Sequence, residues 1–158
     1  MKKKMNNKGF SLVELIVVIA IMAVLIGVLA PTLLGNIEKS RLSKDKSAMD
    51  VLYNAWSNTA GDPDYTLTYP SSFKYDIANS QITVDGFTQV TADAIPAAQL
   101  DAFKNALKAY VGGDTVKLES KYYKGTGSTV TIGFNDKGRC YIKVDSSVDA
   151  KGDYDKNE

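Results

Sequence analysis

Residues 1–35 read MKKKMNNKGFSLVELIVVIAIMAVLIGVLAPTLLG, and this stretch decides the fold. A lysine-rich leader comes first, and the apolar run after it holds one carboxylate, Glu14, near its start. From Leu15 to Ile37 the chain has 23 residues without a charge. At about 1.5 Å per residue, a helix of that length spans the roughly 30 Å hydrocarbon core of a bilayer. A charge so close to an uninterrupted apolar segment is costly, and it therefore indicates function.

A cleaved secretory signal is the obvious alternative for this segment. Such signals have an apolar region of about 7–15 residues followed by an A-x-A-like cleavage site. Here the apolar run is longer, and its end at residues 29–35 offers no clear site of that kind. The small residue at a junction is Gly9, before the run, so cleavage there would leave the hydrophobic helix on the mature protein. A plain signal anchor explains neither Glu14 nor the Lys8-Gly9-Phe10 junction.

The segment Lys8-Gly9-Phe10-Ser11-Leu12-Val13-Glu14-Leu15, with the aliphatic stretch that ends at Pro31, resembles the type III signal of type IV pilins and pseudopilins. The resemblance covers roughly residues 8–35, about a fifth of the chain. It implies that a prepilin peptidase cuts between Gly9 and Phe10 and that the new Phe10 amine is N-methylated. It also implies an assembly role for Glu14, whose carboxylate would pair with the Phe10 ammonium of a neighbouring subunit. The sequence leaves open whether Glu14 pairs with its own Phe10 or with a neighbour's.

The resemblance further implies partners and a location. The partners are other pilin subunits in a homopolymer, the prepilin peptidase, and an inner-membrane assembly platform with its ATPase. The precursor would be a single-pass protein of the cytoplasmic membrane, and the assembled subunit would lie in a cell-surface pilus. Four lysines precede the span, and the positive-inside rule places them in the cytoplasm.

Charge gives no support for nucleic-acid binding. The chain has 19 Lys and Arg residues against 18 Asp and Glu, and the leader holds four lysines and no acids. The mature balance is therefore 15 minus 18, or −3. No specific nucleic-acid partner is expected of so nearly neutral a chain.

Gly27 and Pro31 predict a kink or a melted segment inside the apolar helix. Glycine lacks a side chain, and proline removes a backbone donor and disfavours a straight helix before it. In filaments of the pilin family the corresponding stretch is often unwound. The alternative is that both residues are simply commoner in membrane helices than in soluble ones.

The helix is expected to continue beyond the apolar run, through residues 36–61. One apolar stripe at helical period ends before the stop signal Gly61-Asp62-Pro63; its members are Leu42, Met49, Leu52, Tyr53 and Trp56. The charged stretch from Glu38 to Asp50 is interpreted as the solvated outer face of this helix.

The remaining residues predict an α+β head. Residues 62–80 look like an extended loop, residues 81–85 like a short strand, and residues 96–111 like a helix with Leu100, Phe103, Leu107 and Tyr110 on one face. Strands are expected at 116–123, 129–134 and 139–144, with turns at 125–128 and 135–138. The expected architecture is pilin-like: a leader at 1–9, an apolar membrane and filament-core helix at 10–35, its amphipathic continuation at 36–61, and a head at 62–158. In that head an antiparallel β-meander packs on the long helix, and the sequence does not decide whether the second helix packs there or stands apart at the rim.

Two strands of the head carry clear core faces. Val130, Ile132 and Phe134 alternate on one, and Cys140, Ile142 and Val144 alternate on the next. Cys140 is the only cysteine, so an internal disulfide is impossible and a buried side chain is expected. Many Gram-negative pilins close a C-terminal loop with a disulfide, and this departure suggests a Gram-positive source.

Neither catalysis nor a cofactor or metal is expected. Histidine is absent, and the sequence contains no P-loop, no G-x-S-x-G and no metal-ligand motif. The acidic tail from Asp145 to Glu158 does not follow the EF-hand pattern, so a solvated, frayed tail is favoured over a calcium site.

Three functions fit the sequence. The first is a structural subunit of a type IV pilus, with a Gram-positive major pilin as the favoured form, serving adhesion, motility or aggregation. The second is a pseudopilin of a type II secretion or DNA-uptake machine. The third is a surface binding protein that never polymerises, and Gly9 and Glu14 argue against it.

Substituting Gly9 tests the cleavage site. We expect Gly9→Val to block processing, because the peptidase must fit a small residue before the cut, and to leave the full-length precursor in the membrane. The intact mass of the membrane-extracted chain measures this. A Gly9→Val chain that loses residues 1–9 as the wild type does would refute the assignment.

Overall fold

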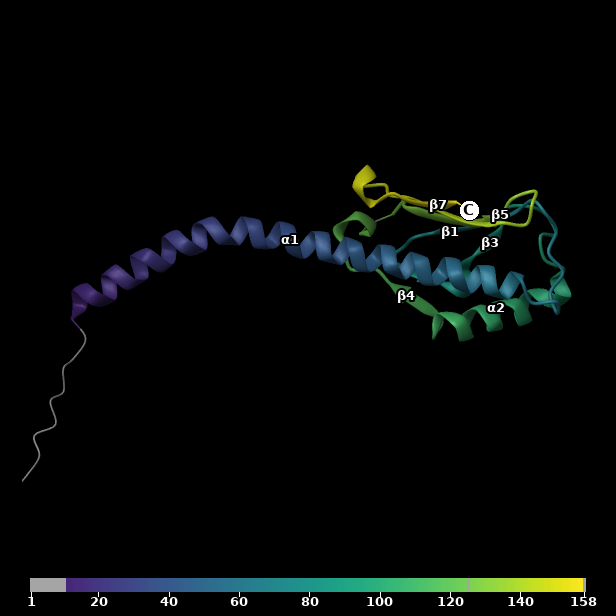
Figure 1. Ribbon diagram of the computed structural model, residues 1–158, viewed down its shortest axis with the longest axis horizontal. Helices are drawn as coiled ribbons and strands as arrows, with labels where there is room; N and C mark the ends of the chain where they lie inside the picture. The colour runs from purple at the N-terminus through teal and green to yellow at the C-terminus, as the bar shows by residue number, and fades with distance from the viewer. Residues whose placement is uncertain (1–10, 125, 158) are drawn as a thin grey trace, which may run out of the picture. The chain divides into compact units, whose positions relative to one another are not determined.

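The computed structural model describes residues 11–124 and 126–157, and its longest element is helix α1, Leu12–Ala60 (Figure 1). Two compact units divide the chain, with the division inside α1 between Ile37 and Glu38. The first unit is the apolar part of α1. The second unit, called the head here, begins at Glu38 and contains every other helix and strand.

The head contains a five-stranded antiparallel sheet in the order β3-β1-β5-β6-β7. Its strands are β1 (Ser71–Asp76), β3 (Thr88–Gln89), β5 (Thr129–Phe134), β6 (Cys140–Asp145) and β7 (Tyr154–Asn157). On β5, Ile132 pairs with Phe73 on one side and with Ile142 on the other. β5 and β6 form the pair expected from residues 129–134 and 139–144, whereas β7, which was not expected, continues the meander and β1 joins on the other side of β5.

Shorter elements complete the head. A two-stranded sheet joins β2 (Gln81–Thr83) to β4 (Thr115–Lys117). The second helix is α2 (Ala97–Val111), and the 3-10 helices are η1 (Val84–Gly86), η2 (Lys121–Tyr123) and η3 (Ala150–Gly152). α2 ends at Gly112, whose φ of 81° is in the left-handed region that favours glycine, and whose N–H bonds to the carbonyl of Lys108.

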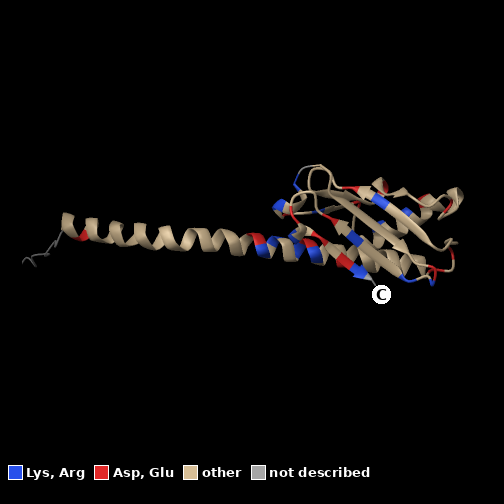
Figure 2. Ribbon diagram, turned by 90° about the horizontal axis from the view of Figure 1, so that it is seen from above, with Lys and Arg blue, Asp and Glu red and all other residues tan. Residues whose placement is uncertain are grey.

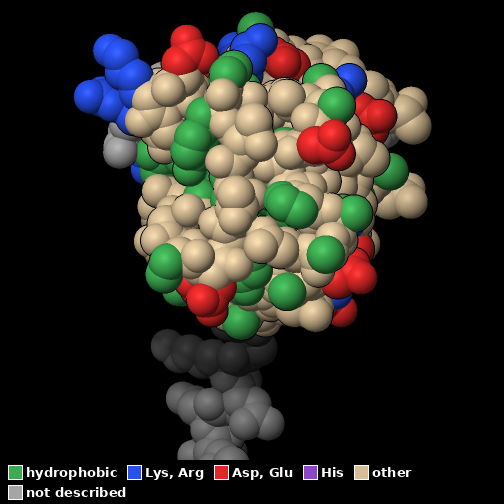
Figure 3. Space-filling view, turned by 90° about the vertical axis from the view of Figure 1, so that its right-hand side faces the viewer, with side chains coloured by type: hydrophobic (Ala, Val, Ile, Leu, Met, Phe, Trp, Pro, Cys, Tyr) green, Lys and Arg blue, Asp and Glu red, His purple; other side chains and the backbone are tan. Residues whose placement is uncertain are grey.

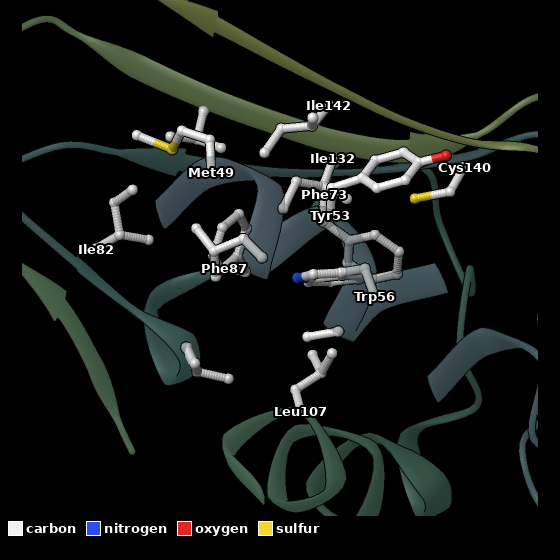
Figure 4. Close-up of a cluster of buried hydrophobic side chains, with 14 of the residues drawn as sticks. Met49, Tyr53, Trp56, Phe73, Ile82, Phe87, Leu107, Ile132, Cys140 and Ile142 are labelled. Carbon is white, nitrogen blue, oxygen red and sulfur yellow. The ribbon is translucent and has the colours of Figure 1, made fainter. Parts of the chain in front are cut away.

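The core forms where the upper part of α1 lies between the five-stranded sheet and α2 (Figure 4). Trp56 is its centre: the ring centroid lies 4.6 Å from that of Phe73 on β1 and 5.4 Å from that of Phe103 on α2. The expected stripe of α1 is confirmed, since Met49, Leu52, Tyr53 and Trp56 are buried and Leu42 packs against the cluster. The head therefore has three layers, which are the five-stranded sheet, the upper part of α1 and α2.

The α+β, pilin-like layout is confirmed, as are several elements in detail. α2 begins one residue after the expected start and ends where expected, and β5 has the expected bounds. Both alternating sets on β5 and β6 are buried, including Cys140.

Four local expectations about the head were wrong. The supposed loop at 62–80 contains β1, which pairs with β5 over six residues. The supposed strand at 116–123 stops at Lys117 and continues into η2. Tyr110 is exposed instead of packing on the core. The tail is ordered as η3 and edge strand β7, because β7 finds ladder partners on β6.

The acidic residues of α1 are a further correction. Asp45 is only 1% exposed, and its two carboxylate oxygens accept the backbone N–H groups of Glu119 and Ser120, each at 2.8 Å. Glu38 accepts the backbone N–H of Lys121. The interpretation of residues 38–50 as a solvated face is therefore wrong for these carboxylates, which hold the segment between β4 and η2 on α1.

Asp50 makes a similar contact with the C-terminal strand. Its Oδ1 accepts from the Tyr154 hydroxyl at 2.7 Å and from Lys156 Nζ at 3.0 Å. These hydrogen bonds lower the pKa of Asp50, and burial together with the Asp50 contact raises the pKa of Tyr154. The strand that closes the sheet is thereby tied to the same helix.

Removing the Asp45 carboxylate should destabilise the head strongly. In Asp45→Ala one buried and one partly buried backbone N–H group lose a charged acceptor, which costs about 2–4 kcal/mol in the free energy of unfolding. Trp56, the only tryptophan, reports unfolding by fluorescence in a urea titration. Ser47→Ala on the exposed part of the same helix is the control. Equal urea midpoints for the two variants would contradict the stabilising role of the Asp45 carboxylate.

Tyr123 gives the head a defined alkaline limit. Its hydroxyl donates to the Gly152 carbonyl, and burial, with the charges of Asp45 and Asp153, raises its pKa to about 12. Because the folded pKa lies above the unfolded value of 10.0, this contribution to stability is full below pH 10 and is lost as pH rises towards 12. The stability difference between wild type and Tyr123→Phe should therefore narrow from pH 9 to pH 12. A difference in urea midpoint between wild type and Tyr123→Phe that stays constant from pH 9 to pH 12 would contradict this role of the Tyr123 hydroxyl.

Candidate functional site

The start of α1 brings Ser11 and Glu14 together. Ser11 immediately precedes the first helical residue, and its backbone N–H donates to Glu14 Oε2 at 2.9 Å. Leu15 N–H closes the first turn on the Ser11 carbonyl at 3.2 Å. A Glu that bonds back to the backbone N–H three residues earlier is one half of a capping box, and its charge also favours the positive end of the helix dipole.

This capping contact was not expected, although the sequence contains its signal. Ser11-Leu12-Val13-Glu14 has the S-x-x-E spacing of a capping box before an apolar run. In the described single chain Glu14 thus has a local structural role. The one described bond uses one acceptor site, and an ionised carboxylate offers about four, so capacity remains for an ammonium partner.

Gly9 and Phe10, the residues expected to form the cleavage site and the methylated terminus, lie outside the described residues. The expected pairing between Glu14 and a Phe10 ammonium therefore stays a prediction. The structure places Glu14 in the first turn of α1, four residues after Phe10 in the sequence.

The apolar part of α1 is exposed in the single chain. Every large hydrophobic side chain from Leu12 to Leu34 is at least 42% exposed. Figure 2 shows one acidic position near the start of this stretch and no further charge before the head. α1 is the one helix among the described residues that is long and apolar enough to cross a membrane, with a mean hydropathy of 3.1 over 18 residues.

Gly27 and Pro31 lie within an unbroken α-helix. The expected melted segment is thus not found in the described single chain, where the surrounding hydrogen bonds keep the helix intact. The two residues are nevertheless coupled. Pro31 has no N–H to give to the carbonyl four residues earlier, which belongs to Gly27, and the proline ring crowds that same carbonyl. Kinking or melting in a filament stays a prediction.

No second site of obvious chemistry is present in the described part of the head. Within residues 11–124 and 126–157, no group of three or more His, Cys, Asp or Glu side chains is arranged to hold a metal. The side chain with most nucleophilic character, Cys140, is buried on the core face of β6.

A comparison with protein families agrees with the geometry at the N-terminus. Residues 4–30 match the family model described as the prokaryotic N-terminal methylation motif. No curated protein and no solved structure matches the chain significantly. The matched range includes Gly9, Phe10, Ser11 and Glu14 and most of the exposed apolar helix. The chain therefore carries the type IV prepilin signal, which pilins and pseudopilins share.

Proposed function

We propose that this chain is a structural subunit of a type IV pilus. It is cut by a prepilin peptidase before Phe10, methylated at the new amine, and polymerised through the apolar part of α1 by an assembly platform and its ATPase. The filament would serve adhesion, motility or aggregation at the cell surface. The prepilin signal supports a structural subunit and not an enzyme.

The observation that carries the proposal is the exposed apolar surface of α1 between Leu12 and Leu34. In the precursor this surface has lipid as its solvent. Outside lipid it needs an equally apolar cover, and other copies of the same helix supply one. Burying about ten such side chains at about 1.5–3 kcal/mol each exceeds the estimated cost of association.

Glu14 supports polymerisation over simple anchoring. An anchor gains nothing from a carboxylate at the edge of hydrocarbon, whereas a carboxylate that meets a neighbour's ammonium sets the axial register between subunits. One contact repeated head to tail gives an open helix of subunits and not a closed ring.

The precursor is proposed to have its leader in the cytoplasm and its head outside. Charge counts alone do not favour this orientation, because four cations also follow the span, at Lys39, Arg41, Lys44 and Lys46. Long domains translocate largely regardless of their charge, however, so the short leader with its four lysines dominates the orientation.

Electron microscopy of sheared surface material, with an antibody against residues 62–158, tests the proposal. Fibres labelled along their length support a major pilin, and sparse or tip labelling supports a minor subunit. Antigen that stays in the membrane, without fibres, would reject the pilus and favour a pseudopilin of a secretion or DNA-uptake machine.

Two substitutions of Glu14 separate its charge from its capping role. Glu14→Gln keeps an oxygen that can accept the Ser11 N–H, and Glu14→Ala removes it. If the charge pairs with a neighbour's ammonium, both variants insert into the membrane but lose fibres at least tenfold. Fibre mass per cell after shearing and carbonate-resistant membrane protein are the two measurements. Abundant normal fibres from Glu14→Gln would refute the ion pair.

A further inference from the structure

Exposed cations gather at the end of the head where the chain leaves the apolar segment. Three lie on α1 shortly after Ile37, and three lie on or beside η2 and η3. We call this set the basic patch; its members are Lys39, Arg41, Lys44, Lys121, Lys124 and Lys151. In Figure 2 blue and red positions are interspersed at this end of the head.

Specific contacts hold the three segments together. Glu38 on α1 accepts the backbone N–H of Lys121, which keeps η2 at the level of the first residue of the head. η2 in turn contacts η3, because the Tyr123 hydroxyl donates to the Gly152 carbonyl. The cations of η2 and η3 therefore lie beside those of α1 through hydrogen bonds within the head.

Two carboxylates in the same region are at least partly turned away from solvent, whereas Asp149 and Asp153, on either side of Lys151, are exposed. Asp45 is buried against two backbone N–H groups, and Glu38 is shared between Lys121 N–H and Arg41, whose Nη1 lies 3.7 Å away. Glu119 remains beside Lys44 and neutralises that one lysine.

Four ammonium groups of the patch are left without a carboxylate partner. Within the described residues no carboxylate lies within 4.0 Å of Nζ of Lys39, Lys121, Lys124 or Lys151. The patch thus has six cations against four carboxylates that are not buried, an excess of two positive charges; these carboxylates are Glu38, Glu119, Asp149 and Asp153.

The sequence places this patch close to the end of the apolar run. Lys39 follows Ile37 by two residues, or about 3 Å along the helix, and Lys44 follows it by about 10 Å. The polar headgroup layers of a bilayer add roughly 5–8 Å on each side of the hydrocarbon core. A span that ends near Ile37 thus puts the first cations at the depth of lipid phosphates. Clusters of Lys and Arg beside a span attract anionic lipids, by roughly fivefold in affinity per residue.

We propose that the basic patch binds the phosphate headgroups of anionic phospholipids in the leaflet next to the head. The proposal rests on the membrane-anchored precursor described above and not on filament assembly. Orientation does not explain these cations, because the translocation of a long domain is largely insensitive to them. At the opposite end of the head acidic and basic side chains are likewise scattered among neutral ones (Figure 3).

Native mass spectrometry of the full-length chain in uncharged detergent tests the proposal. The probes are phosphatidylglycerol, phosphatidylcholine and free glycerol phosphate. We expect the wild type to prefer phosphatidylglycerol over phosphatidylcholine, and the triple variant Lys39→Gln, Lys121→Gln, Lys151→Gln to lose at least tenfold of that preference. The control, Lys74→Gln, Lys137→Gln, Lys143→Gln, removes the same charge from the β-sheet strands and a hairpin turn and should change it less than twofold.

Each outcome decides the question. An equal loss of lipid preference in both triple variants would refute lipid binding by the basic patch, because the leader lysines are common to all three chains. A wild type without preference for phosphatidylglycerol would refute it as well. Displacement of the lipid by free glycerol phosphate would overturn the assignment to a lipid surface. Trp56 fluorescence confirms that the variants are folded. Carbonate extraction separately tests the membrane-anchored precursor, and a failure of fibre assembly leaves the lipid result unchanged.

Discussion

One helix in two solvents is the constraint on which the structure depends. From Leu15 to Ile37 α1 has no charge and is apolar on all sides, and from Glu38 onward it is apolar on one side only. The change in pattern coincides with the division of the chain into two units. A helix that is apolar all round must be buried in lipid or in other helices, whereas a one-sided stripe needs a globular core of its own. The head supplies that core around Trp56. The apolar part of α1, up to Ile37, must instead be covered by lipid or by other molecules.

Carboxylates of α1, and not a disulfide, fasten the head to its helix. Asp45 and Glu38 accept backbone N–H groups of the segment before and within η2, and Asp50 holds β7 through Tyr154 and Lys156. Each contact joins residues more than 70 positions apart, so each closes a long loop of chain onto a single helix. Hydrogen bonds to a charged acceptor contribute about 1.5–3 kcal/mol each, and they are costly to break when buried. With one cysteine, this chain has no covalent alternative.

The sequence predicted what depends on local periodicity and missed what depends on distant partners. The stripe on α1, the length of α2 and the alternating faces of β5 and β6 follow from spacings of three to four or of two residues. The sequence did not predict β1, because Pro70-Ser71-Ser72 resembles a loop and the strand's main partner, β5, lies more than 50 residues later. Asp45 escaped because an acidic residue in a charged stretch is normally solvated, and the N–H groups that satisfy it belong to an irregular segment. The Ser11–Glu14 cap is different: its spacing was visible, but the resemblance had already given Glu14 another role.

Glu14 and Asp45 show how burial decides the use of the same chemical group. Both accept backbone N–H groups. Asp45 is buried and accepts a hydrogen bond with each oxygen, so its carboxylate stabilises the fold and is not accessible to another partner. Glu14 makes its described bond with one oxygen, at an exposed helix start. The cap contributes about 1 kcal/mol, which is small beside the cost of holding an ionised carboxylate at the edge of hydrocarbon. Capping alone therefore does not account for a charge at this position. A cation from outside the helix would account for it, and the free amine that the proposed cleavage before Phe10 would create is such a cation.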